Sequence, residues 1–136
     1  MKSAGYSGTP LWKKLGIKEG FRIYLKNAPG DYRDWISPVP ENVSFLKRRT
    51  REIDLAHIFV SRTADLGNLL SDLYDPIHPD GMIWVSWHKK ASKIPTEITE
   101  DVIRDVALPM GLVDVKVCAV SDIWSGLKLV IRRENR

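Results

Sequence analysis

The spacing of apolar residues alternates along the chain between a pattern typical of buried strands and one typical of helices. Leu55–Val60 and Met82–Trp87 are almost continuously apolar, as expected of parallel strands covered on both faces. The leucines after Thr63 recur at i, i+3, i+4 and i+7, which predicts a helix with one buried stripe, capped by Thr63. His78–Gly81 is predicted to form a turn before the second strand. These elements predict a strand–helix–strand unit in a parallel sheet.

Shorter elements are predicted on both sides of this unit. Phe21–Leu25 and Val43–Leu46 have the length and composition of short strands, with a short helix over Asp31–Ile36 between them. Further along, Thr99 is placed to cap a helix that Gly111 ends. The alternation of strands and helices therefore extends over most of the chain.

The end of the chain has a period of two. Apolar residues occupy every second position from Val113 to Ala119, which predicts a strand with one buried face. The chain then turns over Ser121–Gly126 and returns through Leu127–Arg132. The sequence thus predicts an α/β fold, a Rossmann-like three-layer sandwich with a mostly parallel sheet that ends in an antiparallel hairpin. We expect residues 1–136 to form a single domain.

Composition narrows the class of protein. Of the 136 residues, 43% are hydrophobic and 28% are charged, as in ordinary folded domains. No apolar run approaches the length of a transmembrane helix, and Met1–Tyr6 lacks the apolar segment of a signal peptide, so we expect a cytoplasmic protein without a membrane partner. Cys118 is the only cysteine, and no two histidines have metal-ligand spacing. No metal site and no cofactor are predicted.

The basic residues are distributed unevenly along the chain. Lys and Arg total 21 against 17 Asp and Glu, a net charge of +4, and many of the basic residues directly follow predicted strands. In an open parallel sheet, ligands bind beyond the carboxyl ends of the strands. The simpler interpretation is that these side chains only populate exposed loops. The residues predicted to bind a ligand at this edge are Lys26, Asn27, Arg48, Trp87, His88, Lys89, Lys90 and Lys93.

Other candidate residues have less specific signals. His57 lies inside an apolar strand, where a core histidine hydrogen-bonded to the backbone is expected. Asp31, Asp34 and Asp122 are predicted to gather near the same edge if the short helix folds over it. His88 is the only histidine expected at the edge, and it has the pKa range of a general base. No residue is assigned as catalytic.

One part of the sequence resembles class I S-adenosylmethionine-dependent methyltransferases. Pro79–Val85 is similar to their proline–glycine turn and fifth strand, and the terminal hairpin resembles their last two strands. That family holds its cofactor with a glycine-rich loop and an acid after the second strand. The corresponding stretches here are Lys26–Asp31, with a single glycine, and Phe45–Arg49, which ends in cations. The resemblance therefore implies the fold without implying methyl transfer.

A second resemblance covers nearly the whole chain. Gly5–Leu11, Trp87–Lys93, Gly111–Val120 and Trp124–Lys128 are similar to a family of short bacterial proteins of unknown function. That resemblance implies a stand-alone domain and brings no activity or catalytic residue with it.

Three hypotheses for the function follow from the basic edge. The first is a non-enzymatic module that binds an anionic ligand, and a mouth of this size fits a phosphorylated metabolite or a nucleotide better than duplex DNA, although nucleic acid stays open as a partner. The second is a small transferase or hydrolase with His88 as base. The third is an interaction domain that docks an acidic protein partner through the same edge.

Overall fold

A mixed six-stranded sheet forms the centre of the molecule, with the strand order β2-β1-β3-β4-β6-β5. The structure is a computed structural model and describes residues 8–136, so the expectations drawn from Met1–Tyr6 lie outside the described residues. The first four strands are parallel to their neighbours, and β6 is antiparallel to both β4 and β5. The predicted mostly parallel sheet with an antiparallel end is confirmed. The strands are β1 (Arg22–Lys26), β2 (Ser44–Leu46), β3 (Ile53–Phe59), β4 (Ile77–His88), β5 (Leu112–Ala119) and β6 (Trp124–Ile131).

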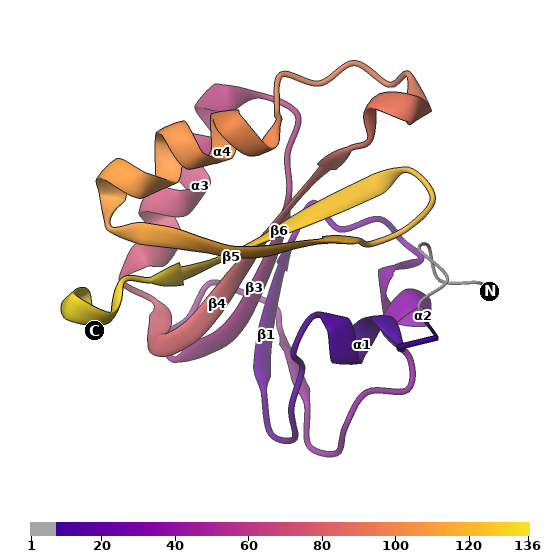
Figure 1. Cartoon of the computed structure of the whole chain (residues 1–136). Helices are drawn as coiled ribbons and strands as arrows, with labels where there is room; N and C mark the ends of the chain where they lie inside the picture. The colour runs from indigo at the N-terminus through magenta and orange to yellow at the C-terminus, as the bar shows by residue number, and fades with distance from the viewer. Residues whose placement is uncertain (1–7) are drawn as a thin grey trace.

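Helices cover both faces of the sheet, which gives the predicted three layers. Figure 1 shows α3 and α4 together on one face and α1 and α2 on the other. Within residues 8–136, no helix is both long enough and apolar enough to cross a membrane. The helices are α1 (Leu11–Lys14), α2 (Tyr32–Ile36), α3 (Thr63–Tyr74) and α4 (Glu100–Ala107), with short 3₁₀ turns η1 (Lys90–Ser92), η2 (Leu108–Met110) and η3 (Arg133–Asn135).

Each face of the sheet has its own apolar core. Under α3 and α4, the predicted leucine stripe is buried, with Leu66 and Leu70 fully inaccessible to solvent. On the other face, Leu15 and Trp84 belong to a second core below α1 and α2. The indole Nε1 of Trp84 donates a hydrogen bond to the carbonyl of Leu15 at 2.9 Å. This bond fixes the segment after α1 to the middle of the sheet.

A bulge replaces the turn predicted before β4. Ile53 and Leu55 of β3 pair with Ile77 and Met82 of β4, respectively. More residues of β4 than of β3 lie between these two pairs, so the extra residues bulge out within one continuous strand. Gly81 closes this bulge. A Cβ atom there would lie 2.9 Å from two backbone carbonyl oxygens, so only glycine fits.

A second bulge makes the predicted valine face of β5 wrong. The register of β5 against β6 shifts between Asp114 and Lys116, because one residue is left unpaired. Val113 therefore faces the α1 side and Val117 the α4 side, since an extra residue reverses the side-chain alternation. Val115 and Val117 are 51% and 44% exposed. The periodicity of the sequence did not reveal this inserted residue.

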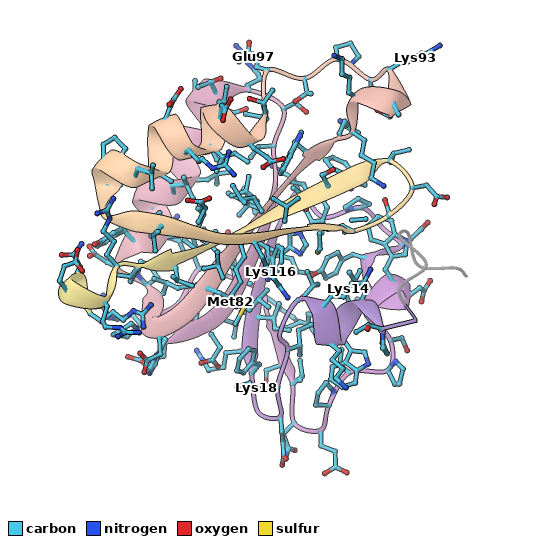
Figure 2. The ribbon with its side chains drawn as sticks, viewed as in Figure 1. Lys14, Lys18, Met82, Lys93, Glu97 and Lys116 are labelled. Carbon is cyan, nitrogen blue, oxygen red and sulfur yellow. The ribbon has the colours of Figure 1, made fainter. Side chains whose placement is uncertain are left out.

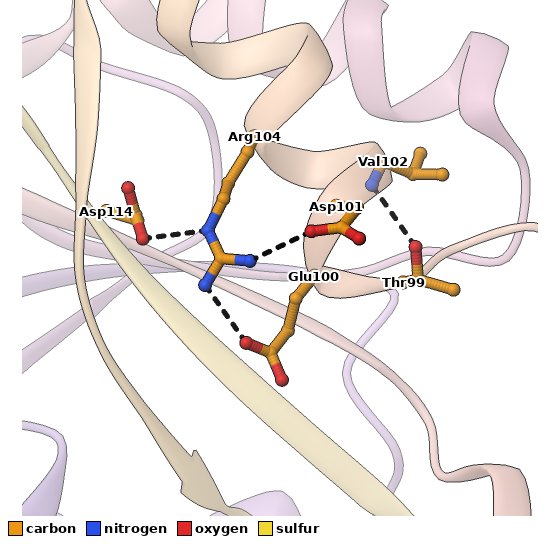
Figure 3. A network of polar contacts seen from close by, with 6 residues as sticks. All are labelled: Thr99, Glu100, Asp101, Val102, Arg104 and Asp114. Carbon is orange, nitrogen blue, oxygen red and sulfur yellow. Dashed lines mark hydrogen bonds and ion pairs between the residues drawn. The ribbon is translucent and has the colours of Figure 1, made fainter.

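One arginine links α4 to β5. Arg104 donates from Nε to Asp114 at 3.0 Å, and its two terminal nitrogens contact Glu100 at 3.0 Å and Asp101 at 3.2 Å (Figure 3). The hydrogen bond from Arg104 is the main reason why the pKa of Asp114 lies below its ordinary value. The network joins the start of α4 to the strand that follows it.

The two predicted helix caps have opposite outcomes. The hydroxyl of Thr99 accepts a hydrogen bond from the backbone N–H of Val102 at 3.2 Å, which confirms the predicted cap of α4 (Figure 3). The predicted cap at Thr63 is wrong, because Arg62 is the cap residue of α3 and its side chain makes no capping bond. Instead, the carboxylate of Glu97 accepts from the N–H of Thr63 at 2.8 Å.

We expect Thr99→Ala to lower the free energy of unfolding by about 1 kcal/mol, because an orphan N–H at the start of α4 loses its acceptor. The measurement is urea denaturation followed by circular dichroism. Thr63→Ala is the matched control, since it removes a hydroxyl from a first turn without removing a cap. Equal losses in both variants would contradict the assignment of the cap to Thr99.

Candidate functional site

Two cavities open at the carboxyl edge of the sheet, where the ends of β1, β3 and β4 meet the β5–β6 connection. One cavity, of about 450 Å³, lies beyond β4, and we call it the rim pocket. The other, of about 590 Å³, lies between α2 and the β5–β6 connection, and we call it the acidic pocket. Both volumes are in the range of small-molecule sites.

The rim pocket brings together four of the predicted ligand residues. Trp87 and His88 come from the end of β4, and Lys90 and Lys93 come from η1 and its C-terminal cap. Trp87 is only 8% exposed and packs into the core under α3 and α4, so it is first a core residue. Its contribution to the pocket is an apolar wall. The remaining lining residues are Ile94, Pro95, Thr96, Ile98 and Thr99.

His88 is held at the mouth of this pocket by strand pairing and by stacking. It pairs with Trp124 across β4 and β6, and the two rings stack with their centroids 3.9 Å apart. Its Nδ1 atom is buried and has no hydrogen-bond partner among the described residues. Burial lowers the pKa of His88, so the neutral ring is favoured. His88 therefore contributes a neutral ring to the lining of the rim pocket, with its Nδ1 atom turned away from solvent.

Backbone hydrogen bonds hold residues 89–99 over the edge of the sheet. Lys89 donates to the carbonyl of Ile123 at 2.8 Å, and Glu97 donates to the carbonyl of Ser61 at 2.8 Å. The Glu97 carboxylate thereby reaches the first turn of α3, where helix N–H groups attract negative charge. In Figure 2, Glu97 lies beside the start of α3, and Lys93 lies at the outer tip of the segment.

The other predicted ligand residues do not line the rim pocket. Lys26 and Arg48 are exposed after β1 and β2 respectively, and Lys89 is half-buried. Asn27 has a positive φ of 60°, and its side-chain amide donates to the carbonyl of Phe59 at 3.3 Å. Asn27 therefore joins the ends of β1 and β3. A ligand role for these residues stays a prediction.

The acidic pocket gathers the three aspartates that the sequence placed near this edge. Asp31 and Asp34 come from the start of α2, and Asp122 comes from the β5–β6 connection. Trp35 lies on the same wall. The carboxyl edge therefore carries both signs of charge, with carboxylates at one cavity and lysines at the other. Among residues 8–136, no group of three or more histidines, cysteines or acids is placed to hold a metal.

A buried hydrogen-bond chain lies below the edge, and sequence reasoning missed most of it. His57 contacts the hydroxyl of Tyr32 through Nδ1 and the hydroxyl of Ser86 through Nε2, both at 2.7 Å. One ring nitrogen donates and the other accepts, in either tautomer. His57 is a core histidine as predicted, but its partners are side chains and not the backbone. All three side chains are at most 1% exposed, so we assign them a structural role.

The arrangement of strands and helices defines the class of this protein. It has the Rossmann-like fold of class I S-adenosylmethionine-dependent methyltransferases. An S-adenosylmethionine-dependent methyltransferase from Aquifex aeolicus superposes with a TM-score of 0.62 at 14% identity, over 89% of this chain and 88% of that one. A ribosomal protein L11 methylase from Lactobacillus delbrueckii subsp. bulgaricus superposes with a TM-score of 0.55 at 9% identity, over 90% and 76%. Identities this low show the fold alone.

The chain belongs to the family described as "Protein of unknown function (DUF3052)", which matches residues 50–133. The predicted similarity to a family of unknown function is thus confirmed. The Trp87–Lys93, Gly111–Val120 and Trp124–Lys128 segments lie inside the match. Gly5–Leu11 lies outside it, and residues 5–7 of that segment lie outside the described structure. A search of the curated proteins finds no match.

We expect the buried histidine to make the protein less stable as the pH falls below 6.5. Burial lowers the pKa of His57 to about 3, so the unfolded chain takes up a proton that the folded chain does not bind until near pH 3. Within this window, stability is lost by up to about 1.4 kcal/mol per pH unit. Urea denaturation between pH 7 and pH 5 measures the slope.

The matched comparison uses His57→Gln and His78→Gln. The first variant removes the buried titration and should reduce the slope, whereas the second removes an exposed ring that contacts the carboxylate of Glu52 at 3.7 Å and should not reduce it. A slope that is the same in all three proteins would contradict the assignment to His57.

Proposed function

We propose that this protein is a non-enzymatic binding module that holds a small anionic ligand in the rim pocket. The observation that carries the proposal is that Lys90, Lys93 and His88 line one cavity. The lysines supply positive charge at its rim, and the ring of His88 forms part of its wall. The charge and the size of the cavity suit a ligand with one phosphate group.

The wall of the pocket favours a ligand that also has an apolar or aromatic part. Trp87, Ile94 and Ile98 contribute apolar surface opposite the lysines. A phosphorylated metabolite or a nucleotide has both a phosphate and a body that can cover such a wall. Duplex nucleic acid fits less well, because a cavity of about 450 Å³ accommodates a single small molecule.

The decisive experiment compares ligands that differ only in their phosphate. We expect AMP to bind more tightly than adenosine, and glucose 6-phosphate more tightly than glucose, in calorimetric titrations at low salt. The affinity should fall as the salt concentration rises, because lysines at the rim supply the attraction. S-adenosylmethionine is included because the structural neighbours include methyltransferases, and salt-insensitive binding of this compound would favour a cofactor site over an anion site.

Two charge reversals locate the ligand. Lys90→Glu combined with Lys93→Glu should weaken AMP binding by about tenfold or more, since two favourable charges become repulsive. Lys47→Glu combined with Lys13→Glu is the matched control, because it makes two charge reversals at exposed lysines outside the pocket. Equal affinity in the double variant and the wild type would overturn the proposal, as would equal losses in the double variant and the control.

A second candidate function uses His88 as a general base in a transferase or hydrolase. The lowered pKa favours this role, since the neutral ring is able to accept a proton. Among the described residues, no carboxylate forms an ion pair with His88, so nothing orients the ring apart from Trp124.

Turnover that disappears in His88→Gln while AMP binding persists would favour the enzyme over the binding module. A variant that loses neither property would leave the lysines as the essential groups. If wild-type protein binds none of the compounds but captures an acidic protein partner through the same lysines, the docking hypothesis replaces both.

A further inference from the structure

Two lysines face each other in the middle of the β5–β6 hairpin. Lys116 and Lys128 are direct partners in the register of the two strands, so their side chains lie on the same face of the sheet. Lys128 is also the partner of Trp84 on β4, and Trp84 belongs to the core below α1. The pair therefore lies on the α1 face of the sheet. This position is separate from the rim pocket at the carboxyl edge.

The bulge in β5 creates this pairing. Without the unpaired residue between Asp114 and Lys116, the strand would place Val115 opposite Lys128 and Lys116 opposite Leu127. Leu127 is 1% exposed and lies in the core under α3 and α4. The bulge keeps the charge of Lys116 out of that core. The consequence is that two like charges stand side by side.

Two further lysines approach this pair from the segment around α1. The pKa of the Lys128 ammonium group is lowered mainly by burial, to a smaller extent by Lys116, and then by Lys18. Lys18 is therefore near enough to Lys128 to act on it. Lys14 and Lys116 both act on the pKa of Cys118, which burial raises and the two lysines lower. Figure 2 shows Lys14 on α1, Lys18 in the segment that follows α1 and Lys116 on β5. We call Lys18, Lys116 and Lys128 the lysine cluster.

The lysine cluster is unfavourable without a partner of opposite charge. Like charges at a direct cross-strand position destabilise a sheet, and partial burial adds to the cost at Lys128. Among residues 8–136, no carboxylate forms an ion pair with Lys18, Lys116 or Lys128. Positive charges kept together in this way form a binding surface for an anion.

We propose that the lysine cluster is a second binding site, which takes a compact ligand with several negative charges on a short chain of phosphates. Lys116 and Lys128 are direct cross-strand partners, and Lys18 from the segment after α1 acts on Lys128, so three positive charges lie within a short span. A di- or triphosphate group places its charges within a similarly short span. An extended nucleic-acid backbone would engage only part of such a cluster at a time.

Inorganic tripolyphosphate is the probe for this site, measured by calorimetry and by protection of Cys118. This thiol is the only one in the chain. Burial raises its pKa, whereas Lys14 and Lys116 both lower it, so the thiol lies near the lysine cluster. We expect tripolyphosphate to bind and to slow alkylation of Cys118. ATP binding with equal protection would assign the phosphate chain to a nucleotide, whereas ATP binding more weakly than tripolyphosphate would assign it to a free polyphosphate.

The variants Lys116→Gln and Lys128→Gln test the cluster against a merely structural role. Each should weaken tripolyphosphate binding by about tenfold. Without the probe, Lys116→Gln should raise the melting temperature, because the repulsion across the hairpin is removed. Lys47→Gln is the matched control and should change neither quantity.

Several outcomes would overturn the proposal. These are unchanged affinity in both cluster variants, an equal loss in Lys47→Gln, or tighter binding of single-stranded RNA than of tripolyphosphate. The rim-pocket double variant with Lys90→Glu and Lys93→Glu should still bind tripolyphosphate at the lysine cluster. Failure of one site is thus distinguishable from failure of the other.

Discussion

The hydrogen-bond chain through His57 is the constraint on which the carboxyl edge depends. It joins α2, β3 and β4 through the hydroxyls of Tyr32 and Ser86. An unsatisfied polar group at any of these fully buried positions would cost free energy, so the three elements keep one relative placement. The ring of Tyr32 also packs edge-on against Phe59, whose ring meets Trp124 in the same way. The space above β1 and β3 is therefore filled by the protein's own aromatic side chains.

This filling separates the two cavities of the edge. The acidic pocket lies on the outer side of α2, because Tyr32 and Ile36 point inward while Asp31 and Asp34 remain exposed. The rim pocket lies beyond β4, where His88 stacks on Trp124 at the far end of the same aromatic group. One buried network thus supports two cavities of opposite charge. Proteins with the same fold as the methyltransferases need not share a ligand, since the site residues are not the fold residues.

The fold was predictable because its signals are local. The apolar runs of β3 and β4, the leucine stripe of α3 and the cap at Thr99 are each visible within a few residues. The errors arose where pairing between distant strands decides the outcome. The bulge in β5 is set by its register against β6, and the bulge at Gly81 by its fit against β3. The candidate site divides in the same way. The predicted residues that line the rim pocket lie within the short segment from Trp87 to Lys93, whereas the partners of His57 come from two other elements, α2 and β4.

Glu97 gives the start of α3 a property that matters for any anion at this edge. Its carboxylate is tethered to the same chain as the helix N–H that it contacts, so its effective concentration at that position is far above that of a dissolved ion. An external anion must compete with the Glu97 carboxylate for the N–H of Thr63. Glu97 forms no ion pair with Lys90 or Lys93, the lysines of the rim pocket. The helix end, which in many nucleotide-binding folds attracts phosphate, is here already neutralised. The start of α3 is therefore a less favourable position for an external anion than a helix end without such a carboxylate.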